Sequence, residues 1–374
     1  MRIAVNTRFL LRGELEGYGY FIRETFQRIT RAHPGHQFIF IFDRPFDREF
    51  LFAPNVEGVV TGPPARHPLL WKFWYDVRVP AVLKKFKADV FVSPDGFGSL
   101  ATRVPQCLVL HDLAFLHHPG FIHASHLRFY KKYTGRFLEK ASIVATVSEF
   151  SKRDIISHYP MPEQKIGVVG SAAKECFVPL GYEAREKVKQ KFTGGREFFL
   201  HTGAIHPRKN LVHLLKAFSL FKKRQQSGMK LVLAGRLAWK YGSFIKDLES
   251  YKYRDDVVLT GYLEESDLAA LTGAAYAAVY PSWHEGFGVP VLEAMQCGVP
   301  VITSSDSSMQ EIAGEAALYA PPGEFSAIAE NMMRLYKDEN LRRQMAEMGR
   351  TRCLDFSWDQ TAEKLWSCIR KTIG

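Results

Sequence analysis

Residues 281–300, PSWHEGFGVPVLEAMQCGVP, are predicted to form a glycine-rich loop followed by the start of a helix. The segment follows a predicted strand, carries Gly286 and Gly288 around Phe287, and places Pro290 in the expected first helical turn. Glycine lets the backbone approach a ligand closely, and proline is favoured where a helix begins. The unpaired N–H groups of such a helix end attract anions. The segment therefore predicts a phosphate-binding site.

Two carboxylates bracket this predicted phosphate site, Glu285 before the helix and Glu293 eight residues later. We expect Glu293 in the first helical turn, where the helix dipole keeps a carboxylate ionised and able to accept hydrogen bonds from a ribose diol. An isolated pair of this kind would more often cap a helix or face solvent. The surrounding loop and helix favour binding instead, with one carboxylate suited to a bound sugar and the other to the nucleoside.

Two adjacent cations, Arg208 and Lys209, come after the predicted strand 197–203. Alone, such residues usually open a helix with exposed charges. Their place after a strand of the second half favours contact with an anion. Fixed cations and helix N–H groups can stabilise the negative charge of a phosphate without a metal ion.

Short β-branched and aromatic runs alternate with helix-period segments along the chain, which is typical of α/β proteins with a parallel sheet covered on both faces. Strands are predicted at residues 2–6, 37–42, 89–93, 106–112 and 142–148, and again at 197–203, 229–235, 256–261, 276–282 and 299–304. Helices are predicted near residues 18–32, 69–87, 125–140 and 149–158 in the first half, and between the strands of the second. Two such series predict two doubly wound domains, with ligand sites at the carboxyl ends of the strands and in a cleft between the domains.

The stretch 170–196 breaks this alternation with Pro179, Gly181 and Gly194-Gly195, and is the predicted linker. We therefore expect an N-terminal domain over residues 1–172, a C-terminal domain over 173–355, and a final helix over 356–374. A chain of 374 residues is long enough for two domains of this size.

The composition, 46% hydrophobic and 24% charged, is that of a folded protein and excludes a disordered one. No apolar run reaches the length of a membrane-spanning helix, and the first residues, MRIAVNTRFLL, are predicted to form a strand rather than a secretory signal. The five cysteines, without a C-x-x-C pair, fit a reduced cytosol. Four histidines gather around Pro119-Gly120 without a carboxylate pattern, and we expect a surface loop there rather than a metal site; they are His117, His118, His123 and His126.

Positive charge is concentrated in the first half, where residues 1–170 hold 23 Lys and Arg against 15 Asp and Glu. Within it, the segment LLWKFWYDVRVPAVLKKFK at 69–87 mixes aromatic and basic residues. It fits a core helix with a solvated basic face, and equally a surface that docks on an anionic membrane or a lipid-diphosphate acceptor. The residues of interest are Trp71, Lys72, Phe73, Trp74, Lys84, Lys85 and Lys87. No nucleic-acid motif accompanies the charge.

Several segments together resemble family 4 of the retaining glycosyltransferases, above all EGFGVPVLEAM, which has that family's E-x7-E spacing. The other matching segments are NTRFLLRGELEGYGYFIRE, HDLAFLHHP, ATVSEFSKRDI, HTGAIHPRKNL, MQEIAGEAALYAPP and FSWDQTAEKLW. The resemblance implies the GT-B fold of two facing Rossmann-like domains, with the last helix returning to the first domain. It is strongest to bacterial mannosyltransferases of surface-polysaccharide assembly.

The resemblance implies a role for each matching residue. Glu293 matches the ribose-binding Glu, Glu285 the Glu near the transferred sugar, Lys209 the Lys on the diphosphate, and His111 a His near that sugar. Where the family often has an Arg, this chain has Ala204, and we expect Arg208 to compensate in part. The predicted donor-binding residues are Glu293, Gly286, Phe287, Gly288, Val289, Gly17, Gly19, Tyr262 and Leu263.

The predicted function is transfer of a hexose, with mannose favoured, from a nucleoside diphosphate sugar to a saccharide or lipid-linked acceptor, with no cofactor. For retention, a double displacement would require a carboxylate nucleophile, for which Glu285 is a candidate by position only. Front-face attack guided by the leaving group is the alternative. Gly17 and Gly19 fit an ordinary turn equally well, and His111 also fits a buried core histidine. Two other functions stay open: a nucleotide-sugar epimerase of the same architecture, and a protein that binds sugar nucleotides without turnover.

Overall fold

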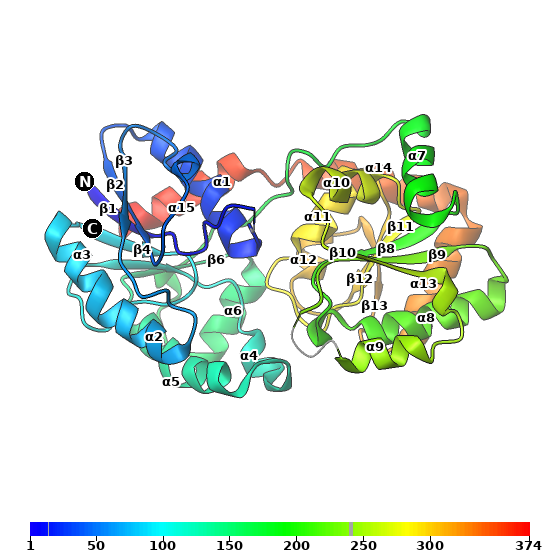
Figure 1. The fold of residues 1–374 in the computed structure, drawn as a ribbon, viewed down its shortest axis with the longest axis horizontal. Coiled ribbons are helices and arrows are strands. Elements are labelled where there is room, and N and C mark those ends of the chain that lie inside the picture. The colour runs from blue at the N-terminus through cyan, green and yellow to red at the C-terminus, as the bar shows by residue number, and fades with distance from the viewer. Residues whose placement is uncertain (14, 239–241) are drawn as a thin grey trace. The chain divides into compact units, whose positions relative to one another are not determined.

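The chain divides into two compact units, residues 1–171 together with 357–374, and residues 172–356. The structure, a computed structural model, describes residues 1–13, 15–238 and 242–374. Each unit contains one parallel sheet with helices on both faces (Figure 1), as the alternating pattern of the sequence predicted. The two units are described separately below.

The first unit contains a seven-stranded parallel sheet in the order β3-β2-β1-β4-β5-β6-β7. Its strands are β1 (Arg2–Asn6), β2 (Gln37–Phe42), β3 (Val56–Val60), β4 (Val90–Ser93), β5 (Gln106–Val109), β6 (Ile143–Thr146) and β7 (Ile166–Val168). Five of them confirm the sequence prediction. The two that were missed lie at the sheet edges, where β3 contains a Glu and a Gly and β7 has three residues.

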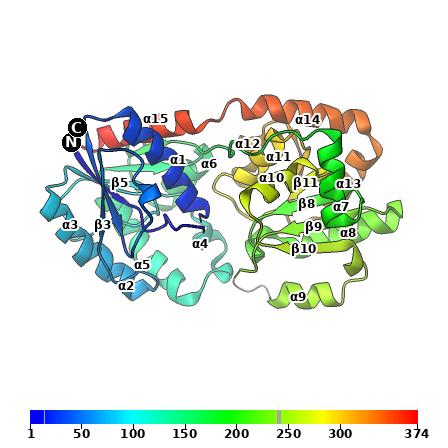
Figure 2. The same cartoon turned by 45° about the horizontal axis from the view of Figure 1, so that its top comes forward.

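The helices of the first unit are α1 (Gly17–Ala32), α2 (Pro68–Phe73), α3 (Val79–Phe86), α4 (Ala114–His117), α5 (Ala124–Lys140), α6 (Glu149–His158) and α15 (Trp358–Lys371). Helix α15, from the end of the chain, lies beside α1 (Figure 2). Arg28 bonds Asp359 at 2.7 Å, and the His33 ring stacks on Trp366 with centroids 3.9 Å apart. The C-terminal helix is thus an integral part of the first unit.

The predicted helix at 69–87 is helical but not regular, since a π-helical turn at Trp74–Arg78 separates α2 from α3. Pro80, in the first turn of α3, accounts for the irregularity, because it has no N–H to donate and its ring crowds the carbonyl four residues earlier. Among the described residues, no helix combines the length and apolar character required to cross a bilayer.

The second unit contains a six-stranded parallel sheet in the order β10-β9-β8-β11-β12-β13. Its strands are β8 (Phe198–Thr202), β9 (Lys230–Ala234), β10 (Val257–Gly261), β11 (Ala277–Tyr280), β12 (Val301–Ser304) and β13 (Ala317–Ala320). The first five were predicted, whereas β13 was not. Its helices are α7 (Tyr182–Thr193), α8 (Leu211–Gln225), α9 (Gly242–Glu249), α10 (Glu265–Gly273), α11 (Val289–Gln296), α12 (Met309–Ala313), α13 (Phe325–Lys337) and α14 (Glu339–Cys353).

The stretch predicted as a linker, 170–196, contains helix α7, which packs against α10 and β10 of the second unit. Gly181 precedes this helix, and Gly194 ends it in the left-handed conformation at φ 61°. The glycines that looked like linker residues are therefore helix boundaries. The helix itself is polar, which is why its period was not visible in the sequence.

Candidate active site

The predicted cations and the first predicted carboxylate meet at the point where the strand order of the second sheet reverses. Strands β8 and β11 are neighbours although three helices and two strands separate them along the chain. Arg208 and Lys209 follow β8, and Glu285 follows β11. Open α/β sheets bind ligands outside the carboxyl ends of the strands at such a reversal.

Glu285 forms an ion pair with both cations at once. Its Oε1 accepts a hydrogen bond from Lys209 Nζ and its Oε2 one from Arg208 Nη1, each at 2.6 Å. Burial alone would raise the pKa of Glu285, but the charges of Arg208 and Lys209 outweigh it and hold the pKa well below its ordinary value. The two neighbouring cations thus converge on one anion.

The loop carrying the two cations is fixed by Asn210, which sequence reasoning missed. Asn210 is left-handed at φ 59°, directly after the 3-10 turn Pro207–Lys209. Its side-chain amide donates to the carbonyls of Pro281 and Pro322 at 2.9 and 2.6 Å. Asparagine tolerates this conformation better than most residues. An Asn directly before the helix-period segment 211–225 was the available signal.

His201, on β8, lies close enough to Lys209 and Glu285 for their charges to affect its pKa. Burial lowers that pKa to about 4, so the ring is neutral at pH 7. Its Nδ1 lies 2.9 Å from the carbonyl of Val279 and donates to it, which leaves Nε2 as a buried acceptor with no hydrogen-bond donor. A neutral imidazole therefore lies within electrostatic range of the ion pair.

The predicted loop and helix start are confirmed. Helix α11 begins at Val289 with Pro290 in its first turn, after Gly288 in the left-handed conformation at φ 98°. The left-handed conformation favours glycine here, and a Cβ at Gly288 would also lie 2.8 Å from Met309 Sδ. The neighbouring Phe287 is buried. Whether Gly286, Phe287, Gly288 and Val289 bind a donor stays a prediction.

Two serines that were not predicted hold the glycine-rich loop from the end of β12. Ser307 Oγ accepts from the Glu285 N–H at 3.2 Å, and the Ser308 hydroxyl lies 2.9 Å from the Glu285 carbonyl oxygen, which accepts from it. Ser307 is left-handed at φ 61°. The signal available in the sequence was SSDSSM, a polar cluster between a predicted strand and a helix.

The expectation for Glu293 was wrong in its electrostatics. Glu293 is the fifth residue of α11, beyond the first turn, and it is buried. Its pKa is raised to about 7, mainly by burial, which outweighs the opposing charge of Lys174 and is aided by the charge of Glu265. The carboxyl is therefore divided between its protonated and ionised forms near neutral pH, instead of being held ionised by the dipole.

Tyr262 and Leu263 follow the edge strand β10, two strands away from β8. Tyr262 is exposed, whereas Leu263 packs against a core cluster that includes Leu200. Ala204 lies in the β8 loop, whose Gly203 carbonyl oxygen closely approaches Gly235. Leu263 thus has a packing role through its contact with the core cluster. A role for Tyr262 or Leu263 in donor binding stays a prediction.

Of the predicted residues of the first unit, His111 lies at a strand end, whereas Gly17 and Gly19 lie in the first turn of α1. His111 follows β5, and its Nε2 lies 3.1 Å from the Pro94 carbonyl. Burial lowers the pKa of His111, so the ring is neutral at pH 7. A Cβ at Gly19 would lie 2.4 Å from the Phe9 carbonyl oxygen, whereas one at Gly17 would meet no atom within 4 Å. Gly19 is thus required by packing.

A buried ion pair that was not predicted spans the strand-order reversal of the first sheet. Arg8 follows β1 and Asp95 follows β4, and Arg8 Nε donates to Asp95 at 2.8 Å. Tyr75 donates to the same carboxylate at 2.7 Å. Arg8 also donates to the Ala65 carbonyl at 2.9 Å. A network of buried polar side chains therefore lies at the strand-order reversal of the first sheet.

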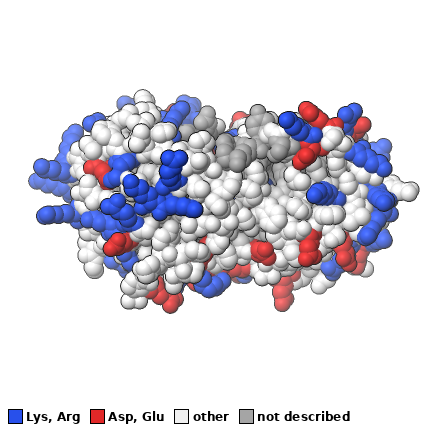
Figure 3. All heavy atoms as spheres, turned by 90° about the horizontal axis from the view of Figure 1, so that it is seen from below, with Lys and Arg blue, Asp and Glu red and all other residues white. Residues whose placement is uncertain are grey.

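The aromatic-basic segment combines core and surface residues. Trp71 and Trp74 are buried, and their indole N–H groups donate to the carbonyls of Ala65 and Thr61, each at 2.7 Å. They cannot act as membrane anchors, which corrects that part of the prediction. Phe73 is 43% exposed. Figure 3 shows Lys and Arg side chains gathered on one face of the first unit.

Two family models match the chain, "Glycosyl transferases group 1" over residues 183–352 and "Glycosyltransferase Family 4" over residues 17–172. The chain is 29% identical to O-antigen chain mannosyltransferase B of Escherichia coli, over 83% of this chain and 80% of that protein. It is 31% identical to the serotype-specific mannosyltransferase WbdA of Escherichia coli, over 68% of this chain and 32% of that longer protein. The solved structure of sucrose-phosphate synthase from Thermosynechococcus elongatus matches with a TM-score of 0.80 at 18% identity, over 99% of this chain and 98% of that one.

Proposed function

The chain belongs to the glycosyltransferases of group 1 and family 4 with the GT-B fold, and from this premise we propose that it transfers mannose from a nucleoside diphosphate sugar. The proposed acceptor is a growing saccharide or a lipid-linked one, as in O-antigen assembly, because that is the activity named for its relatives. The single observation that carries the proposal is the convergence of Arg208 and Lys209 on Glu285 at the strand-order reversal.

In this proposal the donor diphosphate replaces Glu285 as the partner of Arg208 and Lys209. A diphosphate carries more negative charge than one carboxylate and offers several acceptor oxygens, so it competes with Glu285 for Arg208 and Lys209. Glu285 is then released to accept hydrogen bonds from hydroxyls of the transferred sugar. The cations stabilise the charge that develops on the leaving diphosphate, aided by the N–H groups at the start of α11.

We propose that the anomeric configuration is retained by attack on the face from which the diphosphate leaves. A double displacement would require a nucleophilic carboxylate close to the anomeric carbon. Glu285, the candidate by position, is engaged by two cations and has a pKa held far below its ordinary value, both of which reduce its nucleophilicity. The leaving diphosphate, by contrast, can accept the proton of the incoming hydroxyl.

Donor turnover tests the proposal directly. With GDP-mannose and a mannosylated acceptor, the full chain should release GDP and extend the acceptor, and both reactions should continue in EDTA because two side-chain cations serve the leaving group. Slow GDP release without acceptor would distinguish the enzyme from a protein that only binds the donor. An epimerase would convert the sugar while it stays on its diphosphate, and that product would contradict transfer. Activity lost in EDTA and restored by Mg²⁺ would contradict the metal-independent mechanism.

We also propose that the first unit docks reversibly on an anionic membrane from the cytoplasmic side. Leu69 is 76% exposed and lies, with Phe73, on the segment that also carries the α3 lysines. Burial lowers the pKa of Lys72, and the charges of Arg136 and Lys132 on α5 lower it further, so these three cations lie near one another, with Lys72 also paired to Asp76.

Vesicle sedimentation tests the docking. The chain should bind anionic vesicles at low salt and dissociate at high salt, since each basic residue near the membrane contributes about 1 kcal/mol that salt screens. Changing Lys84, Lys85 and Lys87 together to Glu should weaken this binding strongly and leave GDP affinity unchanged. Equal binding to neutral and anionic vesicles would contradict the proposal and favour a saccharide acceptor free of the membrane.

A further inference from the structure

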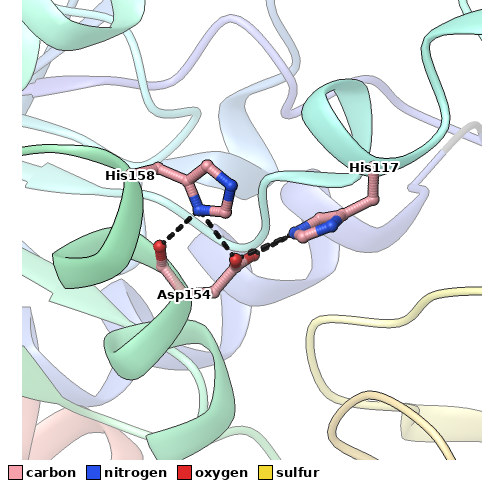
Figure 4. A group of neighbouring side chains, drawn as sticks. All are labelled: His117, Asp154 and His158. Atoms are coloured by element: carbon pink, nitrogen blue, oxygen red, sulfur yellow. Dashed lines mark hydrogen bonds and ion pairs between the residues drawn. The ribbon is translucent and has the colours of Figure 1, made fainter.

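Two imidazoles meet one carboxylate between helices α4 and α6 of the first unit (Figure 4). His117 is the last residue of α4, and Asp154 and His158 lie one turn apart on α6. His117 Nε2 lies 2.8 and 2.9 Å from the two carboxylate oxygens of Asp154, and His158 Nδ1 lies 3.1 Å from one of them. Sequence reasoning grouped His117 with the histidines of its own loop and so missed these partners.

The geometry fits a metal ion. One ligand atom from each of the three residues lies within 4.8 Å of the others, the only such group found among the described residues. Tetrahedral Zn²⁺ holds nitrogen and oxygen ligands at about 2.0–2.2 Å, so its ligand atoms are about 3.3 Å apart. Asp154 is largely buried, whereas the two imidazoles are about one-third exposed.

The ligand chemistry narrows the choice of ion. Imidazole nitrogen suits Zn²⁺ and similar divalent transition ions better than Mg²⁺ or Ca²⁺, which prefer oxygen. Residues i and i+4 of a helix share one face, so Asp154 and His158 can bind one ion while His117 approaches from another element. Three protein ligands leave a fourth position for water on the exposed side.

We propose that His117, Asp154 and His158 bind a divalent transition ion of the Zn²⁺ class that ties α4 to α6. Without the ion, His117 Nε2 bonds the Asp154 carboxylate, whereas His158 Nδ1 lies 2.9 Å from the Asp154 backbone carbonyl oxygen and gives up that hydrogen bond when the ion binds. With it, each imidazole coordinates through the nitrogen that now faces the carboxylate and keeps its proton on the other nitrogen. Helix α4 begins three residues after His111, so the ion would also fix the segment that carries His111. The inference does not depend on the proposed transfer reaction.

Cobalt provides the test, because Co²⁺ occupies Zn²⁺ sites and gives visible absorption bands that depend on its ligands. The full chain without a histidine tag should bind one Co²⁺ with the bands of a four-coordinate ion, and Zn²⁺ should displace it. Zn²⁺ should also raise the thermal midpoint, since an ion that binds only the folded chain stabilises it. Affinity should fall at acid pH, where protons compete for the imidazoles.

His117→Gln and His158→Gln should each weaken Co²⁺ binding at least about 10-fold, the lower end of the loss seen when even outer-sphere partners of a metal are changed. His123→Asn is the matched control: it removes another exposed imidazole of the same region, retains a capping acceptor for α5, and should leave the affinity unchanged. If His158→Gln does not fold, the Co²⁺ affinity of His117→Gln tests the site, since His117 lies at the end of the short helix α4. No saturable binding, or equal affinity in wild type and the His117 variant, would overturn the proposal and leave a hydrogen-bonded brace between two helices.

Discussion

Replacing Glu293 by Gln should make the second unit more stable and the pH dependence of its stability weaker. The pKa of Glu293 is raised from 4.5 to about 7, mainly by burial. Each tenfold change in proton affinity corresponds to about 1.4 kcal/mol, so ionised Glu293 costs the fold about 3 kcal/mol. Glutamine has nearly the same shape and no charge to bury. The variant should therefore recover most of this energy wherever wild-type Glu293 is ionised.

The sign of the pH effect follows from proton linkage. Below about pH 4.5 the carboxyl is protonated in both the folded and the unfolded chain, and no cost arises. Between about 4.5 and 7 the folded chain binds more protons than the unfolded one, so wild-type stability falls as the pH rises. Above about 7 the cost is constant. The advantage of Glu293→Gln over wild type should thus be about 2 kcal/mol larger at pH 8 than at pH 5.

Urea unfolding at the two pH values measures this difference. The stability gain should appear in the unfolding transition of the second unit, and Glu330→Gln, an exposed carboxylate on α13, is the matched control that should change neither value. An advantage of Glu293→Gln that is equal at pH 5 and pH 8 would refute the reasoning, because it would mean that the folded chain holds Glu293 at an ordinary pKa.

The same variant tests the ribose contact predicted for Glu293 from the family resemblance, by calorimetry with a nucleoside diphosphate. Hydrogen bonds to a charged group are worth about 1.5 to 3 kcal/mol, so Glu293→Gln should bind the ligand roughly 10- to 100-fold more weakly at pH 8. Wild-type affinity should also fall from pH 8 to pH 6, as Glu293 takes up a proton, while the variant should show less of this dependence. A variant that is more stable but binds the nucleoside diphosphate with unchanged affinity would support the raised pKa of Glu293 and contradict its contact with the ribose.

Further changes test the cation pair and the backbone around it. Lys209→Ala should lower kcat by about 10² or more, the scale for removing a group that stabilises transition-state charge, whereas Lys216→Ala on the exposed side of α8 should not. Arg208→Ala should lower kcat less than Lys209→Ala, because Arg208 divides its hydrogen bonds between Glu285 and the His284 carbonyl, the latter at 2.7 Å. Equal kcat in wild type and Lys209→Ala would contradict the leaving-group role of Lys209. Gly235→Ala should destabilise the second unit by about 1–3 kcal/mol in urea unfolding, since its Cβ would lie 2.0 Å from the carbonyl oxygen of the β8 loop. Gly181→Ala, whose Cβ meets no atom within 4 Å, should be nearly neutral, and an equal effect of the two alanines would contradict the close-approach argument.

Most of the strands that the sequence predicted are ones that a sheet buries on both faces; the exception is β10, an edge strand that is partly exposed and was nevertheless predicted. Runs such as QFIFIF at 37–42 are apolar throughout, and β2, which they form, is buried at five of its six positions. Edge strands lack this constraint, since water covers part of them. Strand β3 reads VEGVV, and only its first residue is buried, so its sequence resembles a loop. Apolar runs therefore identify the central strands of each sheet more readily than its edge strands.

The residue types of the candidate site were predictable, but their partners were not. The order of strands in a doubly wound sheet brings the ends of β8 and β11 together, which places Lys209 near Glu285. Whether Arg208 points the same way depends on the 3-10 turn that carries both cations, and spacing alone does not reveal that turn. Asn210 and Ser307 take left-handed conformations that lock the loops, and such conformations are set by the final packing.

The error over Glu293 shows which of two electrostatic effects dominates inside a helix. The helix dipole stabilises a carboxylate by about 0.3–1 kcal/mol, reaching about 2 at most, and only within the first turn. Glu293 lies beyond that turn, and its burial acts in the opposite direction with about 3 kcal/mol. A folded chain tolerates such a cost at one position when the rest of the unit is stable enough to maintain it. Glu285 is equally buried, yet two cations reverse the effect, so the two carboxylates of one motif are driven to opposite protonation tendencies. In the proposed reaction this contrast is useful: hydroxyls of the donor can stabilise the ionised form of Glu293 only once they are bound, whereas Glu285 keeps the two cations in place until the diphosphate arrives.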